Sequence, residues 1–251
     1  MLELISQELL LLTLLAIIVF VAGIVRGAIG FGFSALVVAA GTLFLPPSAL
    51  VPMVVLLEII ASVQMLRSAW PSVHWRAHNW LLAALVVATP LGVTALSMAP
   101  DSTLRLIIAV LILAMASLMI SGYRLSGDLG RGHLLSVGFV AGLFNGIAGI
   151  GGMPIAVYLS SSAISLAQMR ATLVMLFFGT ELLFILSALA NDVYSRAIVS
   201  TAVAAVIPMA LGIWLGSRIF ERVDESKLRR ATVLGIFILA LLGLVRAVWQ
   251  G

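Results

Sequence analysis

Long uncharged stretches alternate with short polar junctions along the chain. A helix needs roughly 20 apolar residues to cross a bilayer. Runs of that order without Asp, Glu, Lys or Arg cover Leu9–Val25, Gly27–Leu57, Ala77–Pro100, Leu106–Tyr123, Gly132–Met169 and Ala197–Ser217. No stretch alternates polar and apolar residues as a membrane strand does. The pattern therefore predicts an all-α polytopic membrane protein.

Interruptions within these runs divide them into helical segments. The interruptions are Arg26, the pair Pro46 and Pro47, and the glycines after Asn145. They predict ten apolar segments, at 4–25, 31–45, 49–66, 79–98, 104–122, 133–148, 153–163, 171–189, 197–217 and 229–248. Segments 31–45 and 153–163 are short, so each is either a full crossing or a re-entrant half-helix. We expect 8 to 10 transmembrane segments in total.

Composition excludes several classes of protein. Hydrophobic residues make up 63% of the chain and charged residues 10%, and the mean hydropathy is +1.23, which no ordinary soluble globule shows. The absence of cysteine removes thiol chemistry. The net charge of +4 comes from basic residues that flank apolar segments, which predicts a lipid bilayer and not nucleic acid as the partner. Glu3 and Glu8 replace the basic start of a signal peptide, so we expect the first segment to be a helix.

An internal repeat divides the chain in two. Phe20–Gly32 reads FVAGIVRGAIGFG and Phe139–Gly151 reads FVAGLFNGIAGIG, with seven of thirteen positions identical. A second match joins STLR at Ser102–Arg105 to SKLR at Ser226–Arg229, and an alignment between the two anchors pairs Glu58 with Glu181. We predict one repeat over 1–125 and another over 126–251. Because each contains five segments, an odd number, the second should be inverted.

The distribution of basic residues agrees with inversion. In the first half, the loop after the third segment is basic and the next loop is poor in positive charge, whereas the second half shows the reverse order. The positive-inside rule then places the basic loops in the cytoplasm and both termini in the periplasm. The basic residues of the two cytoplasmic loops are Arg67, Arg76, Arg218, Arg222, Lys227, Arg229 and Arg230.

The glycines fall into two groups. One group recurs at four-residue spacing and predicts close helix packing: Gly23, Gly27, Gly138, Gly142 and Gly146. A second group is too dense for a helix interior, where each glycine costs about 1 kcal/mol relative to alanine, so it predicts helix breaks: Gly30, Gly32, Gly149, Gly151 and Gly152. The run GFGFSA at Gly30–Ala35 fits a dinucleotide-binding pattern but lacks the preceding strand and the later acidic residue, so no cofactor is expected.

A helix that restarts after a break presents unpaired N–H groups to an anion. Pro154 suits the first turn of such a helix. Arg26 lies beside the first break and Asn145 takes the equivalent place beside the second. An arginine between uncharged runs is a functional candidate, although it could also extend to the cytoplasmic interface. We predict a substrate-binding set of Arg26, Gly30, Gly32, Ser34, Asn145, Gly149, Gly151 and Gly152.

Three further charged residues are candidates. Glu58 and Glu181 lie inside apolar helices, where a carboxylate either couples transport to protons or forms a structural pair or hydrogen bond. Arg170 follows Gln168 at the start of the eighth segment, and is either a substrate-binding residue or part of an ordinary interfacial helix start. His74 and His78 have no Cys, Asp or Glu beside them, so no metal site is predicted.

Several motifs together resemble one family. The two FVAG-x-x-x-G-x-x-G-x-G motifs, the Pro46–Pro47 pair, RAT at Arg170–Thr172 and the LR that closes each half are similar to the sulfite exporter TauE/SafE family, the four-toluene-sulfonate uptake permease group. That resemblance covers essentially the whole chain. It implies a carrier in the bacterial cytoplasmic (inner) membrane for sulfite, organosulfonates such as sulfoacetate, or related anions. Asn145 stands where the first half has Arg26, so the two halves do not form a symmetric pair of arginines.

We therefore expect a secondary transporter that exports small sulfur-containing anions by alternating access, with Glu58 and Glu181 as the candidates for proton coupling. Two alternatives are a passive anion channel built on the same paired half-helices and an uptake permease for a related anion. An enzyme is not expected, because no set of His, Asp and Ser side chains clusters near the breaks.

Overall fold

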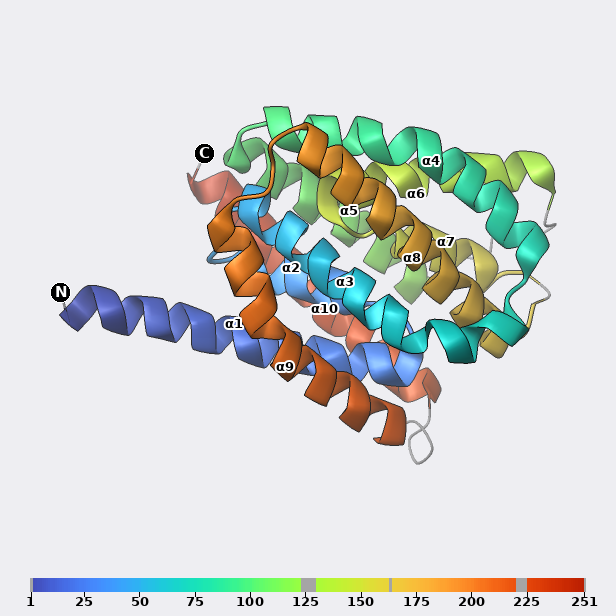
Figure 1. The fold of residues 1–251 in the computed structure, drawn as a ribbon, viewed down its shortest axis with the longest axis horizontal. Helices are drawn as coiled ribbons and strands as arrows, with labels where there is room; N and C mark the ends of the chain where they lie inside the picture. Colours follow the sequence, from blue (N-terminus) through green and yellow to red (C-terminus); the bar gives the residue numbers. More distant parts are fainter. Residues whose placement is uncertain (1, 123–129, 163, 220–224, 251) are drawn as a thin grey trace.

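The computed structural model describes residues 2–122, 130–162, 164–219 and 225–250, which form ten α-helices and one short 3-10 helix without any strand (Figure 1). The prediction of an all-α protein is confirmed. In chain order the helices are α1 (Leu2–Ile29), α2 (Phe33–Gly41), α3 (Pro47–Ala69), η1 (Trp70–Ser72), α4 (Trp75–Met98), α5 (Asp101–Ile120), α6 (Arg131–Ala148), α7 (Gly152–Leu159), α8 (Leu166–Ala190), α9 (Arg196–Ile219) and α10 (Glu225–Gln250).

Seven of the described helices are long and apolar enough to cross a bilayer: α1, α3, α4, α5, α8, α9 and α10. The 18-residue helix α6 is outside that set. With nine and eight residues, α2 and α7 are shorter than the roughly 20 residues that a crossing requires. The chain is therefore a polytopic membrane protein in which the two short helices each follow a break in a longer one.

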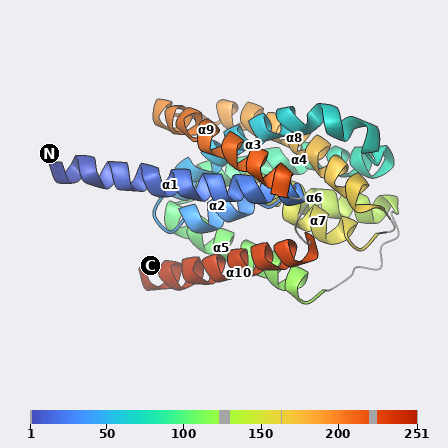
Figure 2. The same cartoon turned by 90° about the horizontal axis from the view of Figure 1, so that it is seen from below.

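We name the two ends of the helix bundle the Asp101 face and the Arg170 face. The Asp101 face contains the start of α3, where the Ser48 N–H donates to the Asp101 carboxylate at 2.9 Å, and the connection between α8 and α9. The Arg170 face contains the start of α8, the start of α4 and the last turn of α1, where Arg170 donates to the Gly27 carbonyl at 2.9 Å. The start of α1 and the end of α10 lie together at one end of the bundle (Figures 1 and 2).

Glycines bring two pairs of parallel helices into close contact. A Cβ added at Gly27 of α1 would lie 2.2 Å from the Ile213 carbonyl of α9, and one added at Gly146 of α6 would lie 2.4 Å from the Thr89 carbonyl of α4. Gly23, Gly138 and Gly142 show the same tight approach. The packing role predicted for these five glycines is confirmed.

The first break lies at the predicted glycines, Gly30 and Gly32, but the first helix ends later than predicted. Arg26 was expected to end the first segment, but α1 continues through it to Ile29, with the Gly30 N–H donating to the Arg26 carbonyl. The chain leaves the helix where Gly30 and Gly32 adopt φ values of 88° and 90°, a region that side chains other than glycine avoid. The arginine therefore lies on the last turn of a helix and not in a loop.

The second break uses its glycines in two ways. Gly149 has a φ of 67° and ends α6, as predicted. Gly151 lies in the break as the N-cap of α7, as predicted, with an ordinary right-handed conformation, whereas Gly152 is already the first residue of α7. Their small size is also needed, because a Cβ at Gly151 would lie 2.6 Å from the Ala141 carbonyl and one at Gly152 would lie 2.2 Å from the Phe177 ring. Pro154 lies in the first turn of α7, as predicted.

The two short helices start near the middle of the bundle and lead in opposite directions. The end of α2 reaches the Asp101 face, where Arg105 donates to the Thr42 carbonyl. The end of α7 packs with residues near the Arg170 face, since Tyr158 shares a core cluster with Ala77 and Met169. In the middle, α3 and α8 pack against each other, and α5 packs against α10 on one side of the bundle (Figure 2).

Three features predicted from the sequence lie outside the described residues: the boundary between the halves at 125 and 126, residue 163 at the end of the seventh segment, and Arg222.

Candidate functional site

Arg26 is fully buried in the centre of the bundle. Its Nη2 lies 3.1 Å from Glu58 Oε2 and donates to Ser62 Oγ at 3.2 Å, both on α3. The guanidinium carbon lies 4.5 Å from the centre of the Phe177 ring on α8. Because no part of this side chain reaches the surface, the alternative that Arg26 extends to the membrane interface is wrong.

The other donors of Arg26 are unused. Nε and Nη1 have no hydrogen-bond partner among the described residues, although both atoms are buried. A buried charged donor without a partner costs free energy. Such groups persist where a ligand, ion or water completes them, so the two nitrogens point to a site for an acceptor.

Glu58 joins Arg26 to the start of α2. Glu58 Oε1 accepts a hydrogen bond from the Ser34 backbone N–H at 3.3 Å, while Oε2 contacts Arg26. The carboxylate therefore occupies the positive end of α2, which favours negative charge there. The sequence predicted that an anion would take this position, and in the structure a side chain of the protein already fills it.

Asn145 and Glu181 lie on the opposite side of the same cluster. Both are buried, and the electrostatic neighbours of Glu181 are Glu58, Asn145 and Arg26. The Asn145 amide has no hydrogen-bond partner on either atom among the described residues, and neither does Glu181 Oε2. The sequence repeat placed Asn145 where the first half has Arg26, and the structure brings both side chains into one polar centre.

Phe177 connects the second break to this centre. Its ring lies under the Arg26 guanidinium and also against Gly152 at the start of α7. Ser62 and Phe177 were not predicted as site residues. Each lies four positions from an embedded carboxylate, Ser62 after Glu58 and Phe177 before Glu181, and residues at that spacing share a helix face. That spacing is the signal that could have identified them.

Three predicted site residues stay outside the polar centre. Arg170 contacts the last turn of α1, because its Nη2 donates to Gly27 and its stem packs against Gly30. Gly32 and Gly149 shape the breaks, and their nearest neighbours are apolar carbons such as those of Val25 and Val51. Arg170 therefore stabilises the open end of α1 at the Arg170 face.

The start of α8 is an ordinary capped helix. Ser165 and Gln168 form a capping box, and Thr172 accepts a hydrogen bond from the His74 N–H at 3.0 Å. Within the described part of the chain, no group of three His, Asp or Glu side chains could bind a metal ion.

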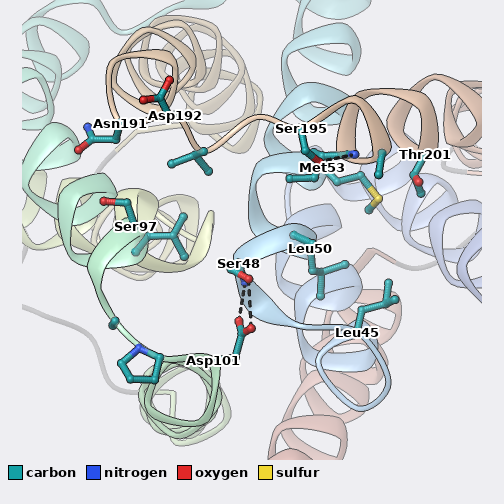
Figure 3. Close-up of a pocket in the computed structure, with 17 residues that line it drawn as sticks. Leu45, Ser48, Leu50, Met53, Ser97, Asp101, Asn191, Asp192, Ser195 and Thr201 are labelled. Carbon is teal, nitrogen blue, oxygen red and sulfur yellow. Dashed lines mark hydrogen bonds between the residues drawn. The ribbon is translucent and has the colours of Figure 1, made fainter.

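A pocket of about 520 Å³ opens on the Asp101 face (Figure 3). The start of α3, the end of α4 and the connection between α8 and α9 line it. Its polar groups include Asp101, Asp192, Ser97 and Asn191 (Figure 3). The residues that line this pocket were not predicted from the sequence, because they come from three separate junctions.

Comparisons with known proteins give one result that covers most of the chain. No curated protein and no solved structure matched it. The family model described as "Sulfite exporter TauE/SafE" matches residues 15–242. The buried charged centre, the polytopic helical fold and this match lead to one conclusion: the chain belongs to the TauE/SafE sulfite exporter family of membrane transport proteins.

Proposed function

We propose that this protein is a secondary transporter that exports small sulfur-containing anions, such as sulfite or an organosulfonate like sulfoacetate, by alternating access. One observation carries the proposal: Arg26 is fully buried while its Nε and Nη1 have no partner among the described residues. A buried, charged guanidinium N–H without a partner can donate to an oxygen of a sulfite or sulfonate group. The family supports an anion as the transported molecule.

In this mechanism the substrate binds beside an existing ion pair. The Glu58 carboxylate neutralises Arg26 when the site is empty and remains on Nη2 at 3.1 Å. The anion accepts a hydrogen bond from a free Arg26 N–H, and the neutral Asn145 amide supplies a donor from the second half. Protons move with the anion through Glu58 or Glu181, because an additional negative charge in a buried centre is otherwise costly.

The proposed movement is a rocking of two inverted halves, residues 1–125 and 126–251. Helix packing supports the inversion. When the halves are exchanged, the contact of α1 with α9 becomes that of α6 with α4, and the contacts of α3 with α8 and of α5 with α10 become themselves. The short helices α2 and α7 follow equivalent breaks and lead to opposite faces.

The proposed orientation places the Arg170 face in the cytoplasm of a bacterial inner membrane and the Asp101 face, with both termini, in the periplasm. Arg67, Arg76, Arg131 and Arg218 lie at helix ends on the Arg170 face, which the positive-inside rule favours as the cytoplasmic side. The carboxylates Asp101 and Asp192 line the pocket on the other face.

Transport into proteoliposomes tests the proposal. We expect saturable movement of ³⁵S-labelled sulfite or sulfoacetate, and exchange of labelled for unlabelled anion. Arg26→Gln should reduce transport at least about a hundredfold, since it removes a charge-assisted hydrogen bond worth roughly 3 kcal/mol. Arg131→Gln is the matched control, because Arg131 lies over the Trp80 ring at the Arg170 face and away from the centre. Undiminished transport in Arg26→Gln would disprove the proposed site.

The same vesicles separate the alternatives. A passive channel would give conductance that does not saturate and no exchange of labelled for unlabelled anion. An uptake permease would transport with the opposite direction of coupling in vesicles of known orientation. Ligand identity is read from thermal unfolding with sulfite, sulfoacetate, taurine, sulfate, thiosulfate and chloride, because a ligand of the folded state raises its apparent stability.

A further inference from the structure

The two buried carboxylates have different surroundings. Glu58 contacts Arg26 at 3.1 Å and accepts the Ser34 N–H, so both of its oxygens have a positive or donor neighbour. Glu181 faces the neutral Asn145 in the place equivalent to Arg26, and its Oε2 has no hydrogen-bond partner among the described residues. A buried carboxylate without a counter-ion is the one that gains most from binding a proton.

The groups around Glu181 come from several elements. The charged groups that face it are Glu58 from α3 and Arg26 from α1, and α6 contributes the Asn145 amide. Tyr194, in the connection between α8 and α9, also interacts electrostatically with Glu181. The titratable His78 lies near the start of α4. The residue before that helix, His74, donates its N–H to the Thr172 hydroxyl, and Thr172 precedes Glu181 by more than two turns of α8.

Tyr194 lies beside the pocket on the Asp101 face and close enough to Glu181 for an electrostatic interaction. Its hydroxyl is buried and has no hydrogen-bond partner within the described parts of the chain. Its neighbours in sequence, Val193 and Ser195, line the pocket (Ser195 is labelled in Figure 3), whereas Tyr194 itself packs against the apolar core. The tyrosine is thus a buried polar group near both the pocket and Glu181.

We infer that Glu181, and not Glu58, binds the coupling proton, and that it exchanges this proton with the Asp101 face through the Tyr194 hydroxyl. The inference rests on the proposed transport function. In the exchange, the Tyr194 oxygen accepts a proton from the pocket and passes its own hydrogen to a bridging water, which gives a proton to a Glu181 oxygen, so one proton moves and the tyrosine stays neutral. The water is required because the two side chains are not hydrogen-bonded to each other. Glu58 remains ionised as the partner of Arg26 throughout the cycle.

Asp101 and Asp192 suit the mouth of such a path. Both carboxylates line the pocket, and negative charge there attracts protons and repels anions. The pocket therefore conducts protons to the centre more readily than it admits a sulfur-containing anion from the Asp101 face.

Proteoliposomes with a trapped pH dye test the inference. The probe is sulfoacetate, whose carboxylate and sulfonate both stay ionised between about pH 6 and 8. The wild type should move protons together with sulfoacetate. Glu181→Gln should lose proton movement by at least about tenfold while it still exchanges labelled for unlabelled sulfoacetate. Tyr194→Phe should slow proton movement by about tenfold with exchange unchanged.

Two control variants and the wild type make each result decisive. Tyr158→Phe changes a buried tyrosine of α7 outside the path and should couple normally. Glu58→Gln should keep proton movement with any transport that remains. Proton movement at the wild-type rate in Glu181→Gln would overturn the inference, as would a Glu58→Gln variant that loses proton movement while it still exchanges sulfoacetate. If Glu181→Gln does not fold, unchanged proton movement in Tyr194→Phe overturns it.

Failure of the underlying function looks different. A wild-type protein that neither exchanges nor accumulates sulfoacetate or sulfite would reject the proposed transporter. A wild-type protein that accumulates sulfoacetate without moving protons would reject only the coupling proton on Glu181.

Discussion

Arg26 and Glu58 form an ion pair with 3.1 Å between Nη2 and Oε2, and their side chains are 0% and 1% exposed. The pair joins the last turn of α1 to the middle of α3. Removing one partner of a buried pair leaves an uncompensated charge, whereas replacing both with apolar side chains of similar size is much less costly. The stability of the central site therefore depends on the two residues jointly.

A double-mutant cycle measures this dependence. Arg26→Met alone and Glu58→Leu alone should each lower the free energy of unfolding by about 3–5 kcal/mol. The double variant Arg26→Met with Glu58→Leu should lose clearly less than the sum of the two single losses. Thermal unfolding in detergent, followed by tryptophan fluorescence, gives the comparison. Additive losses would mean that the two side chains do not stabilise each other.

Packing of α1 on α9 predicts a large effect at one glycine. A Cβ at Gly27 would lie 2.2 Å from the Ile213 carbonyl, and neither backbone can move without separating the helices. We expect Gly27→Ala to destabilise the protein by roughly 2 kcal/mol or more. Gly235→Ala on α10 is the matched control, because nothing lies within 4 Å of its added Cβ. It should be neutral or slightly stabilising by the helix propensity of alanine.

Asp101 should stabilise the start of α3. It accepts hydrogen bonds from the Ser48 N–H at 2.9 Å and the Ser48 hydroxyl at 3.2 Å. Asp101→Ala should therefore cost about 1 kcal/mol, as loss of a helix cap does. Asp192→Asn is the comparison within the same pocket, since asparagine accepts its φ of 52°. Equal melting temperatures for wild type and Asp101→Ala would contradict a capping role.

Tyr194 predicts how stability changes at high pH. Burial first, and then the charge of Glu181, raise the pKa of the Tyr194 hydroxyl above its usual value near 10. Below about pH 10 the hydroxyl is protonated in both states, so it does not alter stability. Above that pH the unfolded chain releases the proton and the folded chain retains it, which lowers stability by up to about 1.4 kcal/mol per pH unit.

Chemical unfolding at pH 8, 10 and 11 checks this expectation. Tyr194→Phe should lose less stability than the wild type between pH 10 and 11, because it has no hydroxyl to ionise. The same decrease in both proteins would show that Tyr194 keeps an ordinary pKa.

Arg170 should keep the Arg170 face closed. Its hydrogen bond to Gly27 and its contact with Gly30 tie the end of α1 to the start of α8. The natural chain has no cysteine, so Ser34→Cys provides a single thiol at the buried start of α2. Adding Arg170→Met to Ser34→Cys should speed labelling of the thiol by a water-soluble maleimide several-fold, because loss of the Arg170 contacts with α1 favours opening of this face. Unchanged labelling would mean that Arg170 does not limit access.

Much of the fold was predictable because the bilayer restricts what a chain can do. Lipid forces backbone polar groups to pair within helices, so uncharged length alone located every helix to within several residues. Spacing by four separated the packing glycines from those at the breaks. The exact end of α1 was not predictable, because a charged residue in an apolar run indicates a helix boundary. In the structure α1 includes Arg26, since Glu58 and Ser62 on α3 bind its guanidinium.

The contacts within the site were much less predictable from the sequence. Gly152 carries no mark in the sequence that distinguishes a glycine in close contact from one in a helix break, and only the position of Phe177 shows which applies. Tyr194 follows an ordinary polar connection, and its relation to Glu181 depends on how α8 and α9 are joined.

The sequence by itself determined that this is a helical membrane protein, that two glycine-rich breaks interrupt it and that Arg26, Glu58 and Glu181 are embedded in apolar helices. These features follow from the cost of placing charge and unpaired backbone in lipid, which is a property of composition and spacing. Only the tertiary structure decided that Arg26 pairs with Glu58 while Glu181 faces Asn145. That choice depends on which helices contact each other across 32 or more residues of chain, and no local pattern contains this information.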